Sequence, residues 1–177
     1  MLANQIVYTE FPSPMGDMIA GATDNGVCFL EWQDRGGVER IFKRVTKRYK
    51  SEPVADKNNN PHLAKLQSEL ESYFDGTLRK FKVKMDVTGT PFEKSVWEQL
   101  LNIPYGQTRS YAQIAQAIGK PQAVRAVGRA NGANYLAIVI PCHRVITSAG
   151  TLGGYGGKIW RKKRLLNLES GAEDLWE

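Results

Sequence analysis

The sequence predicts two domains of different class: a mixed α/β domain over residues 1–87, followed by a helix-rich domain over residues 88–170. The front part combines β-prone segments with two amphipathic helical patterns. The back part is mainly helical and contains a helix-turn-helix pattern. Gly89-Thr90-Pro91 marks the boundary, and residues 171–177 add a short acidic tail.

The front domain opens with β-prone segments separated by turns. Asp24-Asn25-Gly26 is typical of a tight hairpin turn and joins the second and third predicted strands. Cys28 lies in the third strand beside Phe29 and Leu30, and we interpret it as a small buried hydrophobic residue. The three predicted strands are Gln5–Glu10, Met18–Ala22 and Val27–Trp32.

Two helices and a fourth strand complete the front domain. Apolar residues at helical spacing predict a helix over Val38–Arg48, and a second helix is predicted over Leu63–Phe74. The polar segment 51–61 between them is interpreted as an exposed loop. Alternating apolar and polar residues over Phe81–Val87 predict a half-buried strand.

The back domain carries clear helix-start signals. Thr90 followed by Pro91 and Glu93 is a capping-box pattern, so a helix begins there and ends near Ile103-Pro104. Ser110 caps the next helix, which ends at Gly119.

A further helix starts at Pro121 and runs over Gln122–Asn131, which completes the helix-turn-helix pattern. Arg125 and Arg129 are four residues apart and share a face opposite the apolar stripe. An exposed face with two arginines among small residues suits close approach to a nucleic acid groove. A simple solvated surface helix is the alternative.

The charge distribution differs between the two halves. Residues 1–87 hold 13 Lys and Arg against 12 Asp and Glu, whereas residues 88–170 hold 11 against 3. A neutral front and a basic back place any polyanion-binding surface in the back domain. Ordinary surface lysines explain the charge alone equally well.

Composition excludes several classes. No segment has the apolar length of a membrane span, and Met1–Glu10 lacks the pattern of a secretory signal, so we expect a cytoplasmic protein. Two cysteines and two histidines have no zinc-finger spacing, so we expect neither a metal nor a cofactor.

Cys142 is the residue that best suits chemistry. The apolar run Leu136–Ile140 predicts a buried strand, and it leads into Pro141-Cys142-His143. A thiol becomes a nucleophile once a base removes its proton. His143 would point away from Cys142 in a strand but could act through water or across a local turn. From this chemistry alone, a nucleophile and a buried structural cysteine are equally acceptable interpretations.

The surrounding motifs resemble those of the O6-alkylguanine-DNA alkyltransferases, in the single-chain form without a zinc regulatory domain. The resemblance covers the back half from Gly89 to Glu169, with five elements in the family's order. These are Pro141-Cys142-His143-Arg144-Val145, Arg125-Ala126-Val127-Gly128, Asn134, Gly154-Tyr155-Gly156-Gly157, and Leu165-Leu166 with Glu169.

The resemblance implies a ribonuclease-H-like front domain and a winged-helix back domain that binds double-stranded DNA carrying O6-alkylguanine. The helix-turn-helix would enter the minor groove, where Ala126 and Gly128 allow close approach and Arg129 reaches a phosphate. Arg125 would fill the gap left by the flipped nucleotide. The implied protein is a monomer, and cooperative binding to DNA stays open.

The implied chemistry is a single irreversible transfer, formally that of a methylated-DNA–protein-cysteine S-methyltransferase. Glu169, His143 and a bridging water would deprotonate Cys142, which then attacks the alkyl carbon. Tyr111 would donate a hydrogen bond to guanine N3 and, with Asn134, complete the catalytic set. O4-alkylthymine is a further possible substrate.

The implied substrate pocket departs from the family's pattern at one position. Its residues are Pro141, Leu152, Tyr155, Gly156 and Gly157. Many relatives have serine or alanine where this chain has Gly156, so we hypothesise a roomier pocket that accepts alkyl groups larger than methyl. The basic residues 158–164 would either contact phosphates or form a solvated helix face.

Three other classes resemble parts of this pattern. Alkyltransferase-like proteins bind damaged DNA without chemistry but carry tryptophan in place of Cys142. Winged-helix regulators of this family need a cysteine-rich zinc domain, for which the thiols are missing. A cysteine hydrolase using Cys142, His143 and Glu169 would have no use for a helix-turn-helix.

Overall fold

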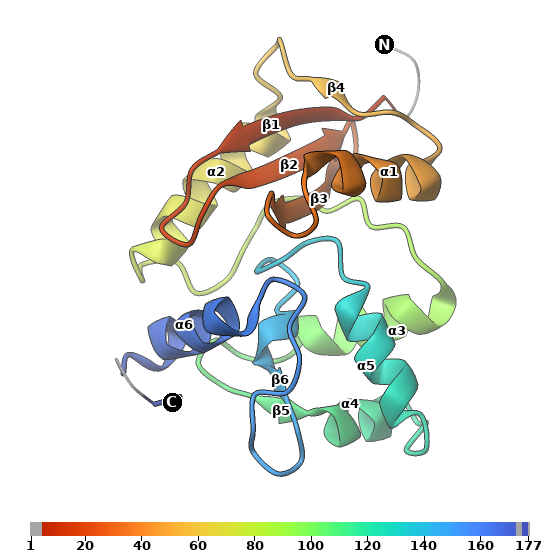
Figure 1. The fold of residues 1–177 in the computed structure, drawn as a ribbon, viewed down its shortest axis with the longest axis vertical. Coiled ribbons are helices and arrows are strands. Elements are labelled where there is room, and N and C mark those ends of the chain that lie inside the picture. The colour runs from red at the N-terminus through yellow and green to blue at the C-terminus, as the bar shows by residue number, and fades with distance from the viewer. Residues whose placement is uncertain (1–4, 173–174, 177) are drawn as a thin grey trace. The chain divides into compact units, whose positions relative to one another are not determined.

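The computed structural model describes residues 5–172 and 175–176. Its contacts divide the chain into two units, Met1–Thr88 and Gly89–Glu177, and the division falls one residue after the predicted boundary (Figure 1). Glu173, Asp174 and Glu177 of the predicted acidic tail lie outside the described residues. Within the described part of the chain, no helix is both long and apolar enough to cross a membrane.

The first unit contains a four-stranded sheet in the order β3-β2-β1-β4. Neighbouring strands β1, β2 and β3 are antiparallel, whereas β4 runs parallel to β1. Every residue of β2 and β3 is buried, as expected where both faces of a sheet are covered. The strands are β1 (Val7–Phe11), β2 (Met18–Thr23), β3 (Gly26–Trp32) and β4 (Val54–Ala55).

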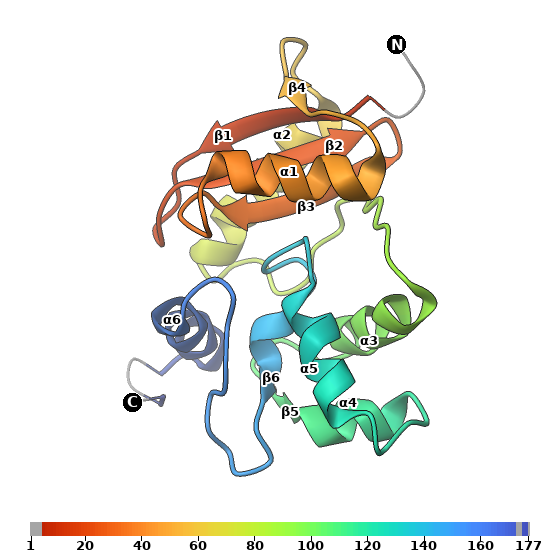
Figure 2. The same cartoon turned by 45° about the vertical axis from the view of Figure 1, so that its right-hand side comes forward.

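The helices α1 (Val38–Tyr49) and α2 (Pro61–Phe74) lie on opposite faces of this sheet (Figure 2). Helix α1 buries Ile41 and Val45, while α2 buries a leucine stripe at the spacing of one helix face. Asn60 caps α2 by accepting hydrogen bonds from the first backbone N–H groups of the helix. Both predicted helices and all three predicted strands of the hairpin region are therefore present.

The predicted strand over Phe81–Val87 is wrong. This segment forms only an isolated parallel bridge between Met85 and Val27. The Glu69 carboxylate accepts the backbone N–H groups of Lys82 and Val83 at 2.9 and 3.1 Å. A side chain from α2 thus satisfies backbone donors that a neighbouring strand would otherwise bind.

The predicted loop over residues 51–61 also needs correction. Val54 and Ala55 form β4, which pairs with β1 through Val7 and Tyr8. Both residues of β4 are exposed, so the predicted exposure is confirmed at these two positions, while the short edge pairing was not foreseen. Two residues are too few to show an alternating pattern.

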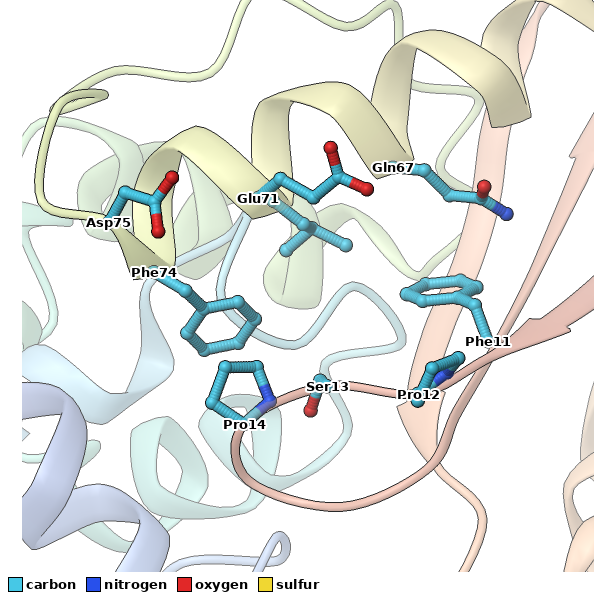
Figure 3. A pocket seen from close by; sticks show the side chains of 9 residues that line it. Phe11, Pro12, Ser13, Pro14, Gln67, Glu71, Phe74 and Asp75 are labelled. Atoms are coloured by element: carbon cyan, nitrogen blue, oxygen red, sulfur yellow. The ribbon is translucent and has the colours of Figure 1, made fainter.

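A groove of about 470 Å³ lies in the first unit between the β1–β2 turn and the end of α2 (Figure 3). Phe11, Pro12 and Pro14 form one side, and Phe74 and Asp75 belong to the other. Its lining side chains are aromatic, proline, aliphatic, amide, hydroxyl and carboxylate groups. None of these lining residues is a cysteine or histidine, so the groove lacks the groups that the predicted chemistry needs.

The second unit is built on short helices. Thr90 and Ser110 both form complete capping boxes, with Glu93 and Gln113 respectively, at the starts of α3 and α4. Both predicted helix starts are therefore confirmed. The elements are α3 (Pro91–Leu101), β5 (Arg109–Ser110), α4 (Tyr111–Ala117), α5 (Val124–Gly132), the 3-10 helix η1 (Cys142–Arg144), β6 (Val145–Ile146) and α6 (Ile159–Ser170).

Helices α4 and α5 form the predicted helix-turn-helix. Gly119 ends the first helix with a φ of +69°, a conformation that glycine adopts without strain. Helix α5 starts at Val124 rather than Gln122, because the Ala123 N–H donates to the Lys120 carbonyl at 2.8 Å and closes a turn there. The Trp97 indole on α3 donates to the Ala130 carbonyl at 2.8 Å and ties α5 to the rest of the unit.

The predicted strand over Leu136–Ile140 is wrong as well. The segment is buried but forms successive turns, with Ile138 in the left-handed region at a φ of +69°. The Asn134 amide donates to the carbonyls of Leu136 and Ile140 and accepts from the Leu136 N–H. One side chain therefore replaces the hydrogen bonds of a partner strand, and apolar composition alone does not reveal this.

Candidate active site

The structure places Cys142 at the start of η1, immediately after these turns. The residue is only 7% exposed. The Asn134 amide donates a hydrogen bond to the Cys142 Sγ at 3.2 Å. The same amide that shapes the preceding turns thus also orients the thiol.

His143 follows Cys142 in a 3-10 turn rather than in a strand, so the alternation expected for a strand does not apply. The His143 side chain is fully buried, and its Nε2 lies 2.7 Å from the Glu169 Oε1. Because a carboxylate accepts, Nε2 carries the proton in the neutral ring. The buried Nδ1 has no hydrogen-bond partner within the described residues, which leaves it as the basic nitrogen.

The charges around His143 favour its neutral form. Burial lowers the pKa of His143 below its ordinary value of 6.5, and Glu169 opposes that shift while Arg144 and Lys162 add to it. A neutral imidazole at pH 7 accepts a proton.

Glu169 is held as a carboxylate by two partners. Burial raises the pKa of Glu169, but His143 and Arg144 outweigh it and hold the pKa well below its ordinary range. Arg144 donates to both carboxylate oxygens at 2.8 and 2.9 Å and to the Ile103 carbonyl at 2.7 Å. The Gly106 N–H adds a contact of 3.3 Å. This fixed carboxylate orients the imidazole.

Tyr111, the first residue of α4, lies between two glycines. A Cβ on Gly128 would lie 4.0 Å from the Tyr111 ring, and one on Gly153 would lie 3.6 Å from its hydroxyl. Burial raises the pKa of Tyr111, and a Cys142 thiolate adds to the shift, so the phenol keeps its proton and can donate.

Neither interpretation of the basic segment 158–164 holds for Lys162 and Arg161, which are buried, whereas Lys158 and Arg164 are exposed. The Lys162 side chain is fully buried, as is most of Arg161. The Lys162 ammonium donates to the carbonyls of Val145, Leu152 and Gly154. Burial lowers its pKa to about 8, while a Cys142 thiolate raises it. Lys162 therefore fastens the loop that follows β6 instead of contacting phosphate.

That loop carries most of the predicted pocket residues. Leu152 and Tyr155 are half-buried, Gly156 is exposed and Gly157 is buried, while Pro141 is buried beside the nucleophile. The Leu152 carbonyl bonds Lys162, and the Gly157 carbonyl accepts from Arg161 at 3.3 Å. The loop is thus anchored to α6.

Four of the predicted DNA-contacting residues lie together on α5, and the fifth, Tyr111, begins α4. Arg125 and Arg129 are exposed, while Ala126 and Gly128 are half-buried. The buried stripe contains Val127 and Ala130. The arginine-bearing face is therefore open to solvent.

Sequence reasoning missed the roles of four residues in this site. Arg144 stood in a quoted motif but without a role. Nothing in the pattern showed that Lys162 anchors the loop after β6 or that Gly106 bonds Glu169. Nor did it show that the Asn131 amide donates to the Cys142 carbonyl at 3.3 Å. The one signal available was Pro104-Tyr105-Gly106, a turn pattern whose glycine has a φ of +76°. The contacts join positions far apart in the chain, which local pattern does not report.

Fold and site together define a class: helix-turn-helix DNA-binding proteins with a buried cysteine beside a histidine–glutamate pair. Two family models match the chain. The ribonuclease-like domain of 6-O-methylguanine DNA methyltransferase matches residues 6–87, and the DNA-binding domain of the same proteins matches residues 91–171. The chain belongs to the 6-O-methylguanine DNA methyltransferase family.

Individual relatives agree. A methylated-DNA–protein-cysteine methyltransferase of Mycobacterium leprae is 46% identical over 76% of this chain and 81% of its own. One from Methanosarcina barkeri is 41% identical over 92% and 96%. The crystal structure of Mycobacterium tuberculosis OGT in complex with DNA matches with a TM-score of 0.79 and 40% identity, covering 96% of this chain and 97% of the other.

Proposed function

We propose that this protein repairs alkylated DNA by moving the alkyl group from guanine O6 to Cys142, once per molecule. One observation carries the proposal: the Cys142 Sγ accepts an amide hydrogen bond from Asn134 beside a buried His143–Glu169 pair. The relatives' name, methylated-DNA–protein-cysteine methyltransferase, describes the same reaction.

The proton of Cys142 leaves first. His143 Nδ1 accepts it through a bridging water, and Glu169 stabilises the imidazolium. The thiolate then attacks the alkyl carbon in line, so that a sulfur–carbon bond forms as the carbon–O6 bond breaks. The electron pair stays on guanine, whose anion takes up one proton. Since no step of this mechanism cleaves the thioether, each protein molecule is consumed by one transfer.

The alkylated base must leave the stack to reach a buried thiol. Arg125 on the exposed face of α5 supports the gap left by the nucleotide, and Arg129 binds a phosphate. The small side chains of Ala126 and Gly128 let this face of α5 approach the floor of the minor groove closely. Tyr111 donates to guanine N3 as negative charge develops.

The proposed DNA partner is double-stranded and carries O6-alkylguanine. The DNA complex of the Mycobacterium tuberculosis relative supports binding to DNA. We also propose a cytoplasmic location, because Cys142 reacts only as a reduced thiol. An alkyltransferase-like role is disfavoured, because such a protein has no use for a cysteine positioned by Asn134.

The test is a titration of the protein with duplex DNA carrying labelled O6-methylguanine. We expect transfer to stop at about one methyl group per protein molecule, and fresh substrate to give no further transfer. Cys142→Ser should transfer none. Repeated turnover, or undiminished transfer by the variant, would contradict the proposal and favour a hydrolase-like or other mechanism.

Gly156, where many relatives have serine or alanine, leads to a second proposal, about the size of the alkyl group that the pocket accepts. Gly156 is exposed in the loop that Lys162 anchors, and the absence of a side chain leaves room beside the alkyl group. We expect transfer from O6-butylguanine, and Gly156→Ser should slow it by several-fold more than transfer from O6-methylguanine. A wild-type protein that reacts with methyl but is refractory to butyl would refute a roomier pocket.

A further inference from the structure

Asn131 is a buried amide on the recognition helix α5 that no step above uses. The residue is 6% exposed, and its Nδ2 donates to the carbonyl oxygen of Cys142 at 3.3 Å. The amide therefore lies against the backbone of the nucleophile itself. It links the DNA-binding helix to the 3-10 turn that carries Cys142.

The other end of this amide is unsatisfied. The Asn131 Oδ1 is buried and has no hydrogen-bond partner within the described residues. Buried polar atoms without partners are costly and uncommon in folded proteins. An acceptor held next to the reacting residue is therefore ready for a donor that a substrate brings.

The position of Asn131 on its helix supports this interpretation. Gly128 precedes Asn131 by three residues, so the two share a face of α5. Gly128 faces the Tyr111 ring, and Asn131 contacts Cys142. This face thus borders both Tyr111 and Cys142, between which the proposed mechanism places the guanine.

The two candidate bases differ in what they offer an acceptor. O6-alkylguanine carries an exocyclic 2-amino group with two N–H donors. O4-alkylthymine has no ring or exocyclic N–H, because its alkylation leaves N3 unprotonated, and it presents the acceptor O2 instead. An acceptor oxygen attracts the first base and repels the second.

We propose that Asn131 is a specificity-determining residue whose Oδ1 accepts a hydrogen bond from the 2-amino group of the flipped guanine. This inference rests on the proposed function. It assigns the protein a preference for O6-alkylguanine over O4-alkylthymine, and places the discriminating atom on the DNA-binding helix. The Nδ2 contact to the Cys142 carbonyl holds the amide in the orientation that presents Oδ1.

The experiment compares single-turnover methyl transfer from three duplexes that differ only in the damaged base. These contain O6-methylguanine, O6-methylhypoxanthine, which lacks the 2-amino group, and O4-methylthymine. Wild-type protein should react with O6-methylguanine about threefold to tenfold faster than with O6-methylhypoxanthine, the loss expected for one hydrogen bond. It should be slower still with O4-methylthymine.

The variant Asn131→Leu keeps the branched shape of the side chain and removes both the acceptor and the Nδ2 donor to the Cys142 carbonyl. Its O6-methylguanine to O6-methylhypoxanthine rate ratio should fall to within about twofold of unity. Because each ratio is taken on one preparation, a partly folded variant does not distort it. Arg129→Ala, on the exposed face of α5, should weaken binding to all three duplexes and leave the ratio unchanged.

A wild-type ratio near unity, or an unchanged ratio in Asn131→Leu, would overturn the assignment of Asn131. Failure of the proposed function looks different, because wild-type protein would then transfer no methyl group to Cys142 from any of the three duplexes.

Discussion

The side chains of Asn134 and Glu169 each form several hydrogen bonds at once, and these bonds fix the positions of the site residues. Asn134 bonds two backbone carbonyls, one N–H and the Cys142 thiol. Glu169 bonds His143 and Arg144 and receives the Gly106 N–H. Shared partners of this kind give coupled rather than additive effects on mutation. Single substitutions here should therefore disturb both the fold of the second unit and its chemistry.

Gly106 offers a test of this close packing. Its φ is +76°, and a Cβ there would lie 2.9 Å from the Glu169 carbonyl oxygen. We expect Gly106→Ala to lower the free energy of unfolding by about 2–4 kcal/mol, from backbone strain together with the collision. Urea denaturation measures this.

Gly119→Ala is the matched control for that experiment. Gly119 lies in the same unit with a φ of +69°, and nothing lies within 4 Å of the added Cβ. It should lose only the strain contribution of about 1–2 kcal/mol. Equal losses in the two variants would show that contact with Glu169 contributes nothing.

At the scale of elements, the exposed face of α5 carries the proposed DNA contact. Arg125 and Arg129 are exposed there, whereas the basic segment on α6 proved partly buried, with Lys162 anchoring the loop after β6. A sum of charges along a segment does not show this difference. The packing of α6 decides which basic side chains are exposed to solvent and which donate hydrogen bonds to backbone carbonyls.

Arg129→Ala tests the phosphate contact. If Arg129 neutralises one phosphate, its removal should weaken binding to duplex DNA and make the slope of log binding constant against log salt concentration shallower by about one. Fluorescence anisotropy at several salt concentrations gives the slope. Lys57→Ala, at an exposed position of the near-neutral front domain, should leave it unchanged. An unaltered slope in Arg129→Ala would exclude the contact.

Secondary structure followed from sequence where local chemistry determines it. Thr90 and Ser110 marked two helix starts because their capping boxes are complete within four residues. Leu136–Ile140 and Phe81–Val87 were mistaken for strands because side chains bind their backbones: Asn134, just before the first segment, and Glu69 on α2.

The residues of the candidate site also fall into two groups, those that the sequence identified and those that it did not. Cys142, His143, Glu169, Tyr111 and Asn134 were identified through motifs that the chain shares with a family. The resemblance said nothing of Asn131 or of the burial of Lys162, which depend on contacts formed only in the folded unit.

At the scale of the whole molecule, the buried groups Glu169, Arg144 and His143 make the free energy of unfolding depend on pH. The pKa of Glu169 is lowered, so its contribution is present above its ordinary value of 4.5 and is lost as the pH falls below that value. The pKa of His143 is lowered too. Below pH 6.5 the unfolded chain therefore binds a proton that the folded chain does not, and stability again falls on acidification.

The variant Glu169→Gln measures how much the Glu169 carboxylate contributes to the pH dependence of stability. At pH 7 the variant should be less stable than wild type by about 3 kcal/mol, because Arg144 loses its buried counter-charge. That difference should shrink as the pH falls below 4.5, where the wild-type carboxylate begins to lose its advantage. Urea denaturation at a series of pH values measures it. A difference that stays constant from pH 7 to pH 3 would contradict the assigned ionisation.

In the proposed reaction Cys142, and not the other cysteine of the chain, takes the alkyl group. The chain has two cysteines, and both are buried. Burial raises the pKa of Cys28 to about 12, so Cys28 is an internal control that should not react. The protein is treated with excess duplex DNA containing O6-methylguanine, digested, and its peptides are mapped by mass spectrometry. We predict one added methyl group, on the peptide that contains Cys142, with the Cys28 peptide unmodified. A methyl group on Cys28, or repaired DNA with neither peptide modified, would contradict the account.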